Sequence, residues 1–265
     1  MTNFATKTET FRALHVPGKP FILANAWDIG SARLLAHLGA KAIATSSAAH
    51  AFTLGLTDGE VTRDQAVAHA QALNLAVDLP VSGDFEHGYG HDTHSVVTTI
   101  NAAIAAGLAG CCIEDTAVPD GKSYGFGHAV ARIEAAVDAI RQHEEDFVLT
   151  ARADGVLRGN YNTDEAIRRL QAFEAAGADV LYAPFLPNLD ELARLCRAVK
   201  GPVNVLCAGP FTRYTVADFA NAGVARISLG SSLSAVTRQV VTDVATTMFT
   251  SGDLSLLGKV QVVVG

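Results

Sequence analysis

The sequence predicts a (β/α)8 TIM barrel, an α/β fold in which eight parallel strands close into a cylinder surrounded by helices, as one domain over residues 1–265. Barrels of this kind commonly have about this length. Short apolar or β-branched runs alternate along the chain with longer amphipathic, alanine-rich segments, which is the pattern of parallel βαβ units. No linker-like or low-complexity segment divides the chain.

The individual strands and helices follow from that alternation. Thr62 and Thr163 are expected to cap two helices, because a hydroxyl at an N-cap accepts a hydrogen bond from the first turn. A long C-terminal helix is expected after Gly230. The expected strands are residues 21–27, 41–47, 81–86, 110–115, 146–154, 179–185, 202–208 and 225–230.

Glycines provide a second regularity. Gly39, Gly107, Gly177 and Gly223 each follow a predicted helix and precede a predicted strand. Glycine at that position adopts the left-handed conformation that ends a helix without a Cβ clash. The competing architecture is a doubly wound open sheet, which usually has a Gly-rich turn after its first strand. That segment reads NAWDIGSA here, which favours the barrel.

Composition and charge limit the function. Hydrophobic residues make up 49% of the chain and charged residues 18%, enough for a sizeable core. The net charge of −7 gives no attraction to nucleic acid or to an anionic membrane, and no apolar run is long enough to span a bilayer. The first residues lack the layout of a signal peptide, and the four cysteines form no CxxC pair. We therefore expect a cytoplasmic protein with reduced thiols and a small-molecule ligand.

Polar residues at the predicted strand ends mark the candidate site, because the chemistry of such barrels sits where the carboxyl ends of the strands meet. Asp84 and Glu86 are two residues apart, so on a strand both would point the same way and repel each other. A divalent cation relieves that repulsion, and oxygen-only ligands favour Mg2+, with Mn2+ as the alternative, over zinc. Glu114 and Asp58 are expected to converge on the same mouth.

Other interpretations of these residues stay open. Arg152, Arg33 or backbone amides could satisfy the carboxylates of Asp84 and Glu86, which would leave no role for a metal. His87, His91 and His94 cluster after the third strand and could form a zinc site, although ordinary histidines of a loop and a helix start explain them better.

Five segments resemble motifs of the phosphoenolpyruvate mutase/isocitrate lyase superfamily. DFEHGYG (84–90) resembles its D-x-[DE]-x-G-[YF]-G signature, CIEDT (112–116) its fourth-strand motif, and TARADG (150–155) its A-R-x-[DE] motif. TSSAAHAFTLGLTDGE (45–60) is similar to its second-strand serine and G-x-x-D loop, and GPVNVL (201–206) to its seventh-strand P-V-N-V. The matches occur in order across roughly residues 20 to 230.

The resemblance implies a role for each candidate residue. Asp58 would line the metal site, Ser46 and the backbone at Ser47 would bind the substrate carboxylate, and Arg152 would hold the oxygens of a 2-oxo acid. The residues that would hold Mg2+, largely through water, are Asp84, Glu86 and Glu114. The further candidates for substrate binding are Trp27, Gly88 and Asn204.

The resemblance also implies an activity and an assembly. Superfamily members cleave or form a C–C or C–P bond beside the enolate of a small 2-oxo or 2-hydroxy acid. Mg2+ and a guanidinium at the enolate oxygen would stabilise charge that grows in the transition state. Members are usually homotetramers, often with the eighth helix swapped between barrels, so we expect a homo-oligomer, either a dimer or a tetramer.

The loop after the fourth strand departs from the superfamily pattern. It reads DTAVPDGKSYGFGHA (115–129), without the K-[KR]-C-G-H of the lyases or the K-x-N-S-like motif of the phosphonate-acting members. Tyr124 or His128 is the candidate proton donor in this loop. Decarboxylation would need little from the loop, so we expect oxaloacetate-type decarboxylation or a retro-aldol cleavage. The alternatives are a C–P hydrolase or mutase acting on phosphonopyruvate, and a barrel that binds oxo acids without turnover.

Overall fold

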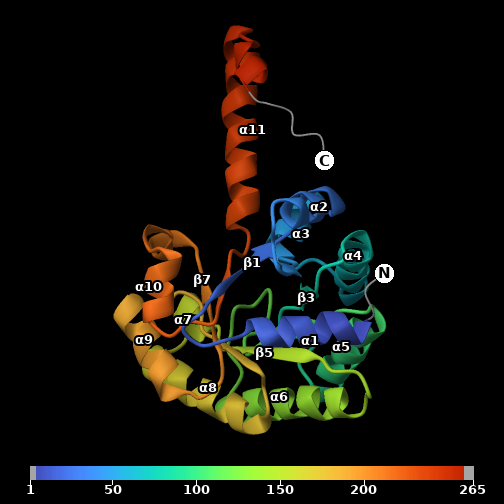
Figure 1. Cartoon of the computed structure of the whole chain (residues 1–265), viewed down its shortest axis with the longest axis vertical. Coiled ribbons are helices and arrows are strands. Elements are labelled where there is room, and N and C mark those ends of the chain that lie inside the picture. The colour runs from blue at the N-terminus through green and yellow to red at the C-terminus, as the bar shows by residue number, and fades with distance from the viewer. Residues whose placement is uncertain (1–3, 260–265) are drawn as a thin grey trace.

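The computed structural model describes residues 4–259, in which eight parallel strands form a closed barrel (Figure 1). Each strand pairs with the next, and the last pairs with the first, so the predicted barrel is confirmed and the open sheet is wrong. Every strand falls within its predicted range. The strands are β1 (Phe21–Asn25), β2 (Ile43–Ala44), β3 (Val81–Asp84), β4 (Gly110–Glu114), β5 (Val148–Arg152), β6 (Val180–Tyr182), β7 (Val203–Leu206) and β8 (Arg226–Ser228).

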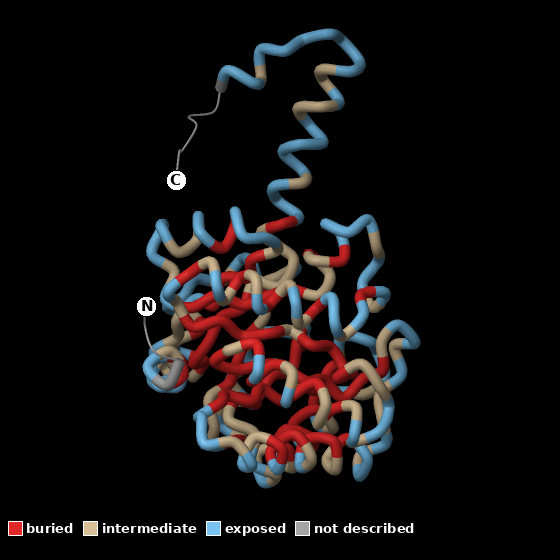
Figure 2. Tube along the Cα trace, turned by 90° about the vertical axis from the view of Figure 1, so that its right-hand side faces the viewer, coloured by how far each residue is buried: buried red, intermediate tan, exposed pale blue. Residues whose placement is uncertain are grey.

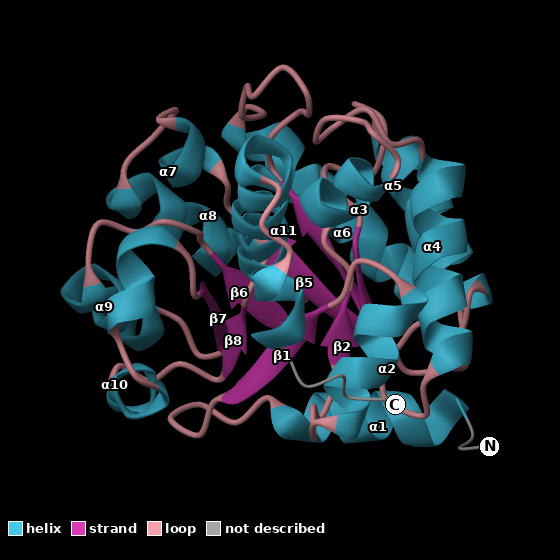
Figure 3. Ribbon diagram, turned by 90° about the horizontal axis from the view of Figure 1, so that it is seen from above, coloured by secondary structure: helices cyan, strands magenta, loops and turns pink. Residues whose placement is uncertain are grey.

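Helices surround the strands, as the view in Figure 3 shows. Thr62 caps its helix as predicted, since its side chain accepts from the Gln65 amide. Asn162, rather than Thr163, caps the other, because Thr163 already lies in the first turn and the Asn162 side chain accepts from the Glu165 amide. The helices are α1 (Phe4–Leu14), α2 (Ile29–His37), α3 (Ser47–Thr53), α4 (Arg63–Ala76), α5 (Thr93–Ala105), α6 (Phe126–Arg141), α7 (Gly155–Arg158), α8 (Thr163–Ala176), α9 (Leu189–Ala198), α10 (Val216–Asn221) and α11 (Ser232–Ser251).

Three helices have no counterpart in the sequence prediction: the short α7 after β5, and α1 and α3 at the two ends of the barrel. Helix α1 packs Phe11 against Leu23, Val148 and Val180 inside the barrel, and so closes its amino-terminal end. Helix α3 replaces the last predicted residues of the second strand, since the chain leaves β2 at Ala44 and enters a helix capped by Ser46. The barrel is therefore filled at one end and open at the other.

The last long helix does not cover the barrel. Helix α11 projects away from it, and most of its length is exposed (Figures 1 and 2). Val236, Val240, Val241 and Phe249 are among its exposed apolar side chains, with Phe249 84% exposed. Across residues 4–259, every helix, α11 included, is too short or too polar to cross a lipid bilayer.

The predicted helix-ending glycines all take the left-handed conformation. Gly39, Gly107, Gly177 and Gly223 have φ angles of 96°, 75°, 108° and 92°. At Gly39 no atom lies within 4 Å of the place a Cβ would occupy, so only the backbone conformation requires glycine there.

We predict that Gly39→Ala lowers the free energy of unfolding by about 1 kcal/mol. The left-handed backbone is strained for alanine, although the added Cβ would meet no neighbouring atom. Gly127→Ala is the matched control: this site in α6 is equally open but has no left-handed φ, so the change should be neutral or stabilising. Urea unfolding of both variants measures the difference, and equal effects would show that the φ angle of Gly39 is not the constraint.

Candidate functional site

A cavity of about 220 Å3 opens at the carboxyl ends of the strands. Small residues line much of it, among them Ala44, Ser82, Gly83 and Ser228, which leaves space where larger side chains would fill the barrel. This is the end at which barrel chemistry was expected. The predicted site residues that line the cavity are Ser46, Ser47, Asp58, Asp84, Arg152 and Asn204.

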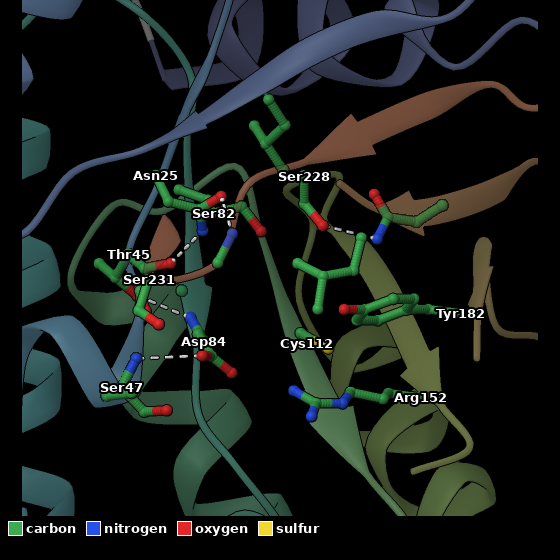
Figure 4. A pocket seen from close by; sticks show the side chains of 18 of the residues that line it. Asn25, Thr45, Ser47, Ser82, Asp84, Cys112, Arg152, Tyr182, Ser228 and Ser231 are labelled. Atoms are coloured by element: carbon green, nitrogen blue, oxygen red, sulfur yellow. Dashed lines mark hydrogen bonds between the residues drawn. The ribbon is translucent and has the colours of Figure 1, made fainter. Parts of the chain in front are cut away.

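Asp84 is fixed at one side of the cavity by the turn between β2 and α3 (Figure 4). Its backbone amide donates to Thr45 Oγ1 at 2.7 Å, and its carboxylate accepts from the Ser47 amide at 3.0 Å. The Ser47 amide was expected to bind the substrate carboxylate, but here it is engaged by Asp84. Its hydrogen bond holds the aspartate in place, while the Ser47 side chain lines the cavity.

Glu86 does not obey the strand alternation that predicted it. Strand β3 ends at Asp84, and Glu86 has a φ of 49°, so the two side chains do not share a strand face. Glu86 is nevertheless buried, with 4% of its surface exposed. Burial and, after it, the neighbouring carboxyl groups of Asp84 and Asp58 together raise the pKa of Glu86 to about 8. Loss of surrounding water and the nearby Asp84 likewise raise the pKa of Asp58 at the cavity mouth.

Glu114 and Arg152 form an ion pair at the ends of adjacent strands. Arg152 Nη1 lies 3.2 Å from Glu114 Oε2, and the same guanidinium pairs with Asp154. Asp154 also accepts from Arg158 Nε at 3.0 Å. Burial raises the pKa of Glu114 well above its usual range although Arg152 opposes that rise. Arg152 thus pairs with Glu114 and Asp154 and not with the Asp84–Glu86 pair that it was considered to neutralise, whereas a backbone amide, that of Ser47, does satisfy one oxygen of Asp84.

The other carboxylate oxygens test whether a metal fits. Glu86 Oε1, Glu114 Oε1 and Tyr89 Oη are buried and have no hydrogen-bond partner within residues 4–259. Buried polar atoms are normally paired with protein or with ordered water. The charges of Glu86, Asp84 and Glu114 also contribute, after burial, to raising the pKa of Tyr89, so these groups are electrostatically close. A hydrated hard cation would satisfy the orphaned oxygens and neutralise the clustered charge.

The same residues do not form a ready-made cage. In the part of the chain that the structure describes, no three His, Cys, Asp or Glu side chains are placed to hold a metal ion together. This finding also gives no support to the zinc site considered at His87, His91 and His94. The fit is thus to a cation held through water, with few direct protein ligands.

Six predicted site residues are not part of the cavity lining: the carboxylates Glu86 and Glu114, the turn residues Trp27 and Gly88, and the loop residues Tyr124 and His128. The Trp27 carbonyl lies 3.1 Å from His69 Nε2, and the Gly88 carbonyl accepts from Thr99 Oγ1 at 2.8 Å. Both carbonyls therefore hydrogen-bond to side chains of neighbouring helices. Neither Trp27 nor Gly88 lines the cavity, and their substrate contacts stay predictions.

Tyr124 and His128 form a separate polar cluster beside the mouth. Tyr124 Oη is 3.0 Å from His91 Nδ1, and His128 Nε2 is 2.7 Å from the His91 carbonyl. His128 is exposed in the first turn of α6. The structure does not bring this pair to the cavity, because the loop bonds to the segment after β3 instead.

The cavity also contains polar residues that sequence analysis missed. Asn25 joins strand ends, accepting from the Leu229 and Gly230 amides at 2.8 and 3.0 Å. Cys112, Tyr182 and Arg226 project from β4, β6 and β8 into the same space. A polar or charged residue inside an otherwise apolar strand, as in FILAN or VARISL, was the available signal.

Comparisons with known proteins show which family the chain resembles. The profile of the family described as "Phosphoenolpyruvate phosphomutase" matches residues 11–249. Among solved structures, a protein from Burkholderia cenocepacia J2315 that is provisionally described as a lyase/mutase has a TM-score of 0.94 and 40% identity, covering 98% of this chain and 94% of that one.

Two relatives of assigned activity are similar over most of the sequence. An oxaloacetate decarboxylase of Paraburkholderia xenovorans is 32% identical, over 88% of this chain and 79% of the relative. A 2-methylisocitrate lyase of Escherichia coli K12 is 30% identical, over 82% of this chain and 76% of the relative. The superfamily resemblance noted in the sequence is thereby confirmed.

The buried Glu86 should make stability depend on pH when no divalent cation is present. Its pKa rises from 4.5 to about 8 on folding. The protonated side chain therefore contributes fully to the free energy of unfolding below pH 4.5, and this contribution is lost as the pH rises through 8. In EDTA at pH 9, Glu86→Gln should therefore be more stable than the parent by about 1–2 kcal/mol, with little difference at pH 5.

Urea unfolding at the two pH values measures this effect, with the exposed Glu144→Gln as control. Parallel behaviour of Glu86→Gln and the parent at both pH values would contradict the assigned burial.

Proposed function

The chain belongs to the phosphoenolpyruvate phosphomutase family, and from this premise we propose that it is a Mg2+-dependent lyase that cleaves a C–C bond in a small 2-oxo or 2-hydroxy acid. The observation that carries the proposal is the meeting of buried carboxyl groups and the Arg152 guanidinium at the end of one cavity. The names of the decarboxylase and lyase relatives support C–C cleavage over the alternatives.

The carboxyl groups would hold the metal. We assign Asp84 as a direct ligand because it lines the cavity, and Glu86 and Glu114 as acceptors for metal-bound water because each has an orphaned oxygen. Asp58 completes the negative mouth. Mg2+, or Mn2+ in its place, would supply Lewis-acid stabilisation of the enolate oxygen.

Arg152 would orient the substrate and stabilise its charge. Its guanidinium is held by Glu114 and Asp154, so it need not reorganise as negative charge grows on the oxo oxygen. Ser46 and the side chain of Ser47 line the cavity beside Asp84, where a substrate carboxylate would lie. We expect Asn204 to act from β7 through its neighbours, since both ends of its amide are hydrogen-bonded.

Oxaloacetate-type decarboxylation is the reaction that depends least on an acid or base from the loop after β4. The C–C bond electrons pass to the oxo group to give an enolate, and CO2 leaves without a base. Tyr124 and His128 stay candidates for returning a proton to the enolate carbon, with the loop moving to deliver it. The alternative is hydrolysis or rearrangement of phosphonopyruvate, because the family is described by a phosphomutase activity.

We predict that Asp84→Asn lowers kcat/KM by at least about 100-fold, since it removes a charge from the metal site while keeping the side-chain size. The measurement is a Mg2+-dependent screen of oxaloacetate, 2-methylisocitrate and phosphonopyruvate with detection of pyruvate. Asp138→Asn, on the exposed face of α6, is the control. Undiminished turnover in Asp84→Asn, or in EDTA, would remove the metal role.

The exposed C-terminal helix supports a homo-oligomer in which α11 is exchanged between barrels. An apolar groove beside β1 is lined by Ile22, Leu35, Leu38 and Leu229, and Leu38 is 69% exposed. This groove lies where a helix following β8 would pack, yet α11 of the same chain projects elsewhere (Figure 1). Burying both apolar surfaces in a dimer or tetramer would stabilise the assembly. We keep the cytoplasm as its predicted location.

We predict that the double change Val236→Asp, Val240→Asp yields a monomer of about 27.7 kDa by light scattering, while the parent is a multiple of that mass. Both valines are exposed in the single chain, so the barrel should remain folded. Gln239→Glu, which adds charge to a polar position of α11, should leave the mass unchanged. A monomeric parent at micromolar concentration would refute the exchange.

A further inference from the structure

Arg226 is a buried cation that the proposed chemistry does not use. It begins β8, lines the cavity and has only 3% of its surface exposed. Its guanidinium lies between His15, just after α1, and Asn204 on β7. Because α1 closes the amino-terminal end of the barrel, Arg226 forms the floor of the cavity, and Asp84 and Asp58 lie toward its mouth.

Both hydrogen-bond partners of Arg226 are neutral. Its Nε donates to Asn204 Oδ1 at 2.8 Å, and its Nη1 lies 3.2 Å from His15 Nε2. His15 Nδ1 is 2.8 Å from the Phe11 carbonyl and must donate to it, which leaves Nε2 as an acceptor on an uncharged ring. Burial and the adjacent Arg226 lower the pKa of His15 to about 3, in agreement with this assignment.

The charge of Arg226 therefore lacks a counter-charge. Arg152 and Arg169 are each paired with buried carboxylates, whereas within residues 4–259 no carboxylate forms an ion pair with Arg226. Burial lowers the pKa of Arg226 to about 10, so the group stays protonated at neutral pH. An unpaired buried charge is costly, and the cavity is the place from which a compensating anion can come.

The cavity connects this cation with the proposed reaction centre. Arg226, Arg152, Cys112 and Tyr182 line the same space. Tyr182 pairs in register with Arg152 on one side and with Asn204 on the other. A ligand anchored at Asp84 and Arg152 thus extends toward Arg226.

The geometry points to Arg226 as the subsite for a second carboxylate of the substrate, which makes the substrate a short dicarboxylic 2-oxo acid. A guanidinium fork suits a planar carboxylate, with which it forms two parallel hydrogen bonds. This inference rests on the proposed function for the position of the oxo acid, but it concerns binding and can be tested without turnover.

The test compares oxaloacetate, whose second carboxylate is separated from the oxo acid by a methylene group, with oxalate, whose two carboxylates are joined directly and which we expect to bind without Arg226. Binding is measured with Mg2+ present, by calorimetry or, if oxaloacetate is consumed, by its KM and the inhibition constant of oxalate. Arg226→Met should lower the affinity for oxaloacetate at least about 30-fold and the affinity for oxalate less than about threefold. Arg226→Lys, which keeps the charge, should restore most of the oxaloacetate affinity.

Asn204→Asp is a second variant, which tests the same subsite in case Arg226→Met does not fold. It keeps the side-chain shape and places an internal carboxylate against Arg226 Nε. The melting temperature should rise, and oxaloacetate should bind more weakly while oxalate is unaffected. Equal losses for both ligands in these variants, or no loss for either, would overturn the subsite.

A free inorganic anion is the other source of a counter-charge. If chloride occupied the floor, added chloride would raise the melting temperature of the parent but not of Arg226→Met, and oxaloacetate affinity would not depend on Arg226. That outcome would refute the substrate subsite. If no acid is turned over but oxaloacetate binding still depends on Arg226, the subsite stands and the lyase proposal fails.

Discussion

Mutual repulsion among carboxyl groups at the open end of the barrel is the constraint on which the rest of the site depends. Asp84, Glu86 and Glu114 arrive there from β3, the turn after it, and β4, because parallel strands all end at the same face. Among the described residues 4–259, Arg152 alone forms an ion pair with any of them, and it is shared with Asp154. The surplus of negative charge and the orphaned oxygens at one rim are what a hard cation would resolve.

The barrel could be predicted because its signals are local and repeated. Each strand lies inside a predicted segment, and glycines such as Gly177 end their helices in the expected left-handed conformation. Helix α1 and helix α3 were missed because their roles are set by tertiary contacts: α1 is held by Phe11 inside the barrel. Capping by Asn162 instead of Thr163 shows that adjacent capping residues cannot be separated by type alone.

The site residues at strand ends could be predicted from the sequence. Those whose position depends on the path of a loop, or on which strand residues face the barrel interior, could not. Asp84 and Arg152 lie where strand positions place them, but Glu86 reached the same rim through a turn with positive φ, so the alternation argument was wrong for it. Tyr124 depends on the path of a loop, which residue types do not define. Arg226 carried a signal, since it is an arginine inside an otherwise apolar strand, but sequence alone does not define whether such a side chain points into the barrel or toward the helices.

The two ends of the cavity thus differ in charge, negative at the mouth and positive at the floor, with Arg152 between them. The claim on which this account depends is that one hydrated cation occupies the rim, and a crystal structure with Mn2+ tests it most directly. We predict one anomalous peak per chain beside Asp84, with waters bridging to Glu86 and Glu114. A map in which those carboxylates are occupied only by Arg152 and by one another, with no peak near Asp84, would contradict the account.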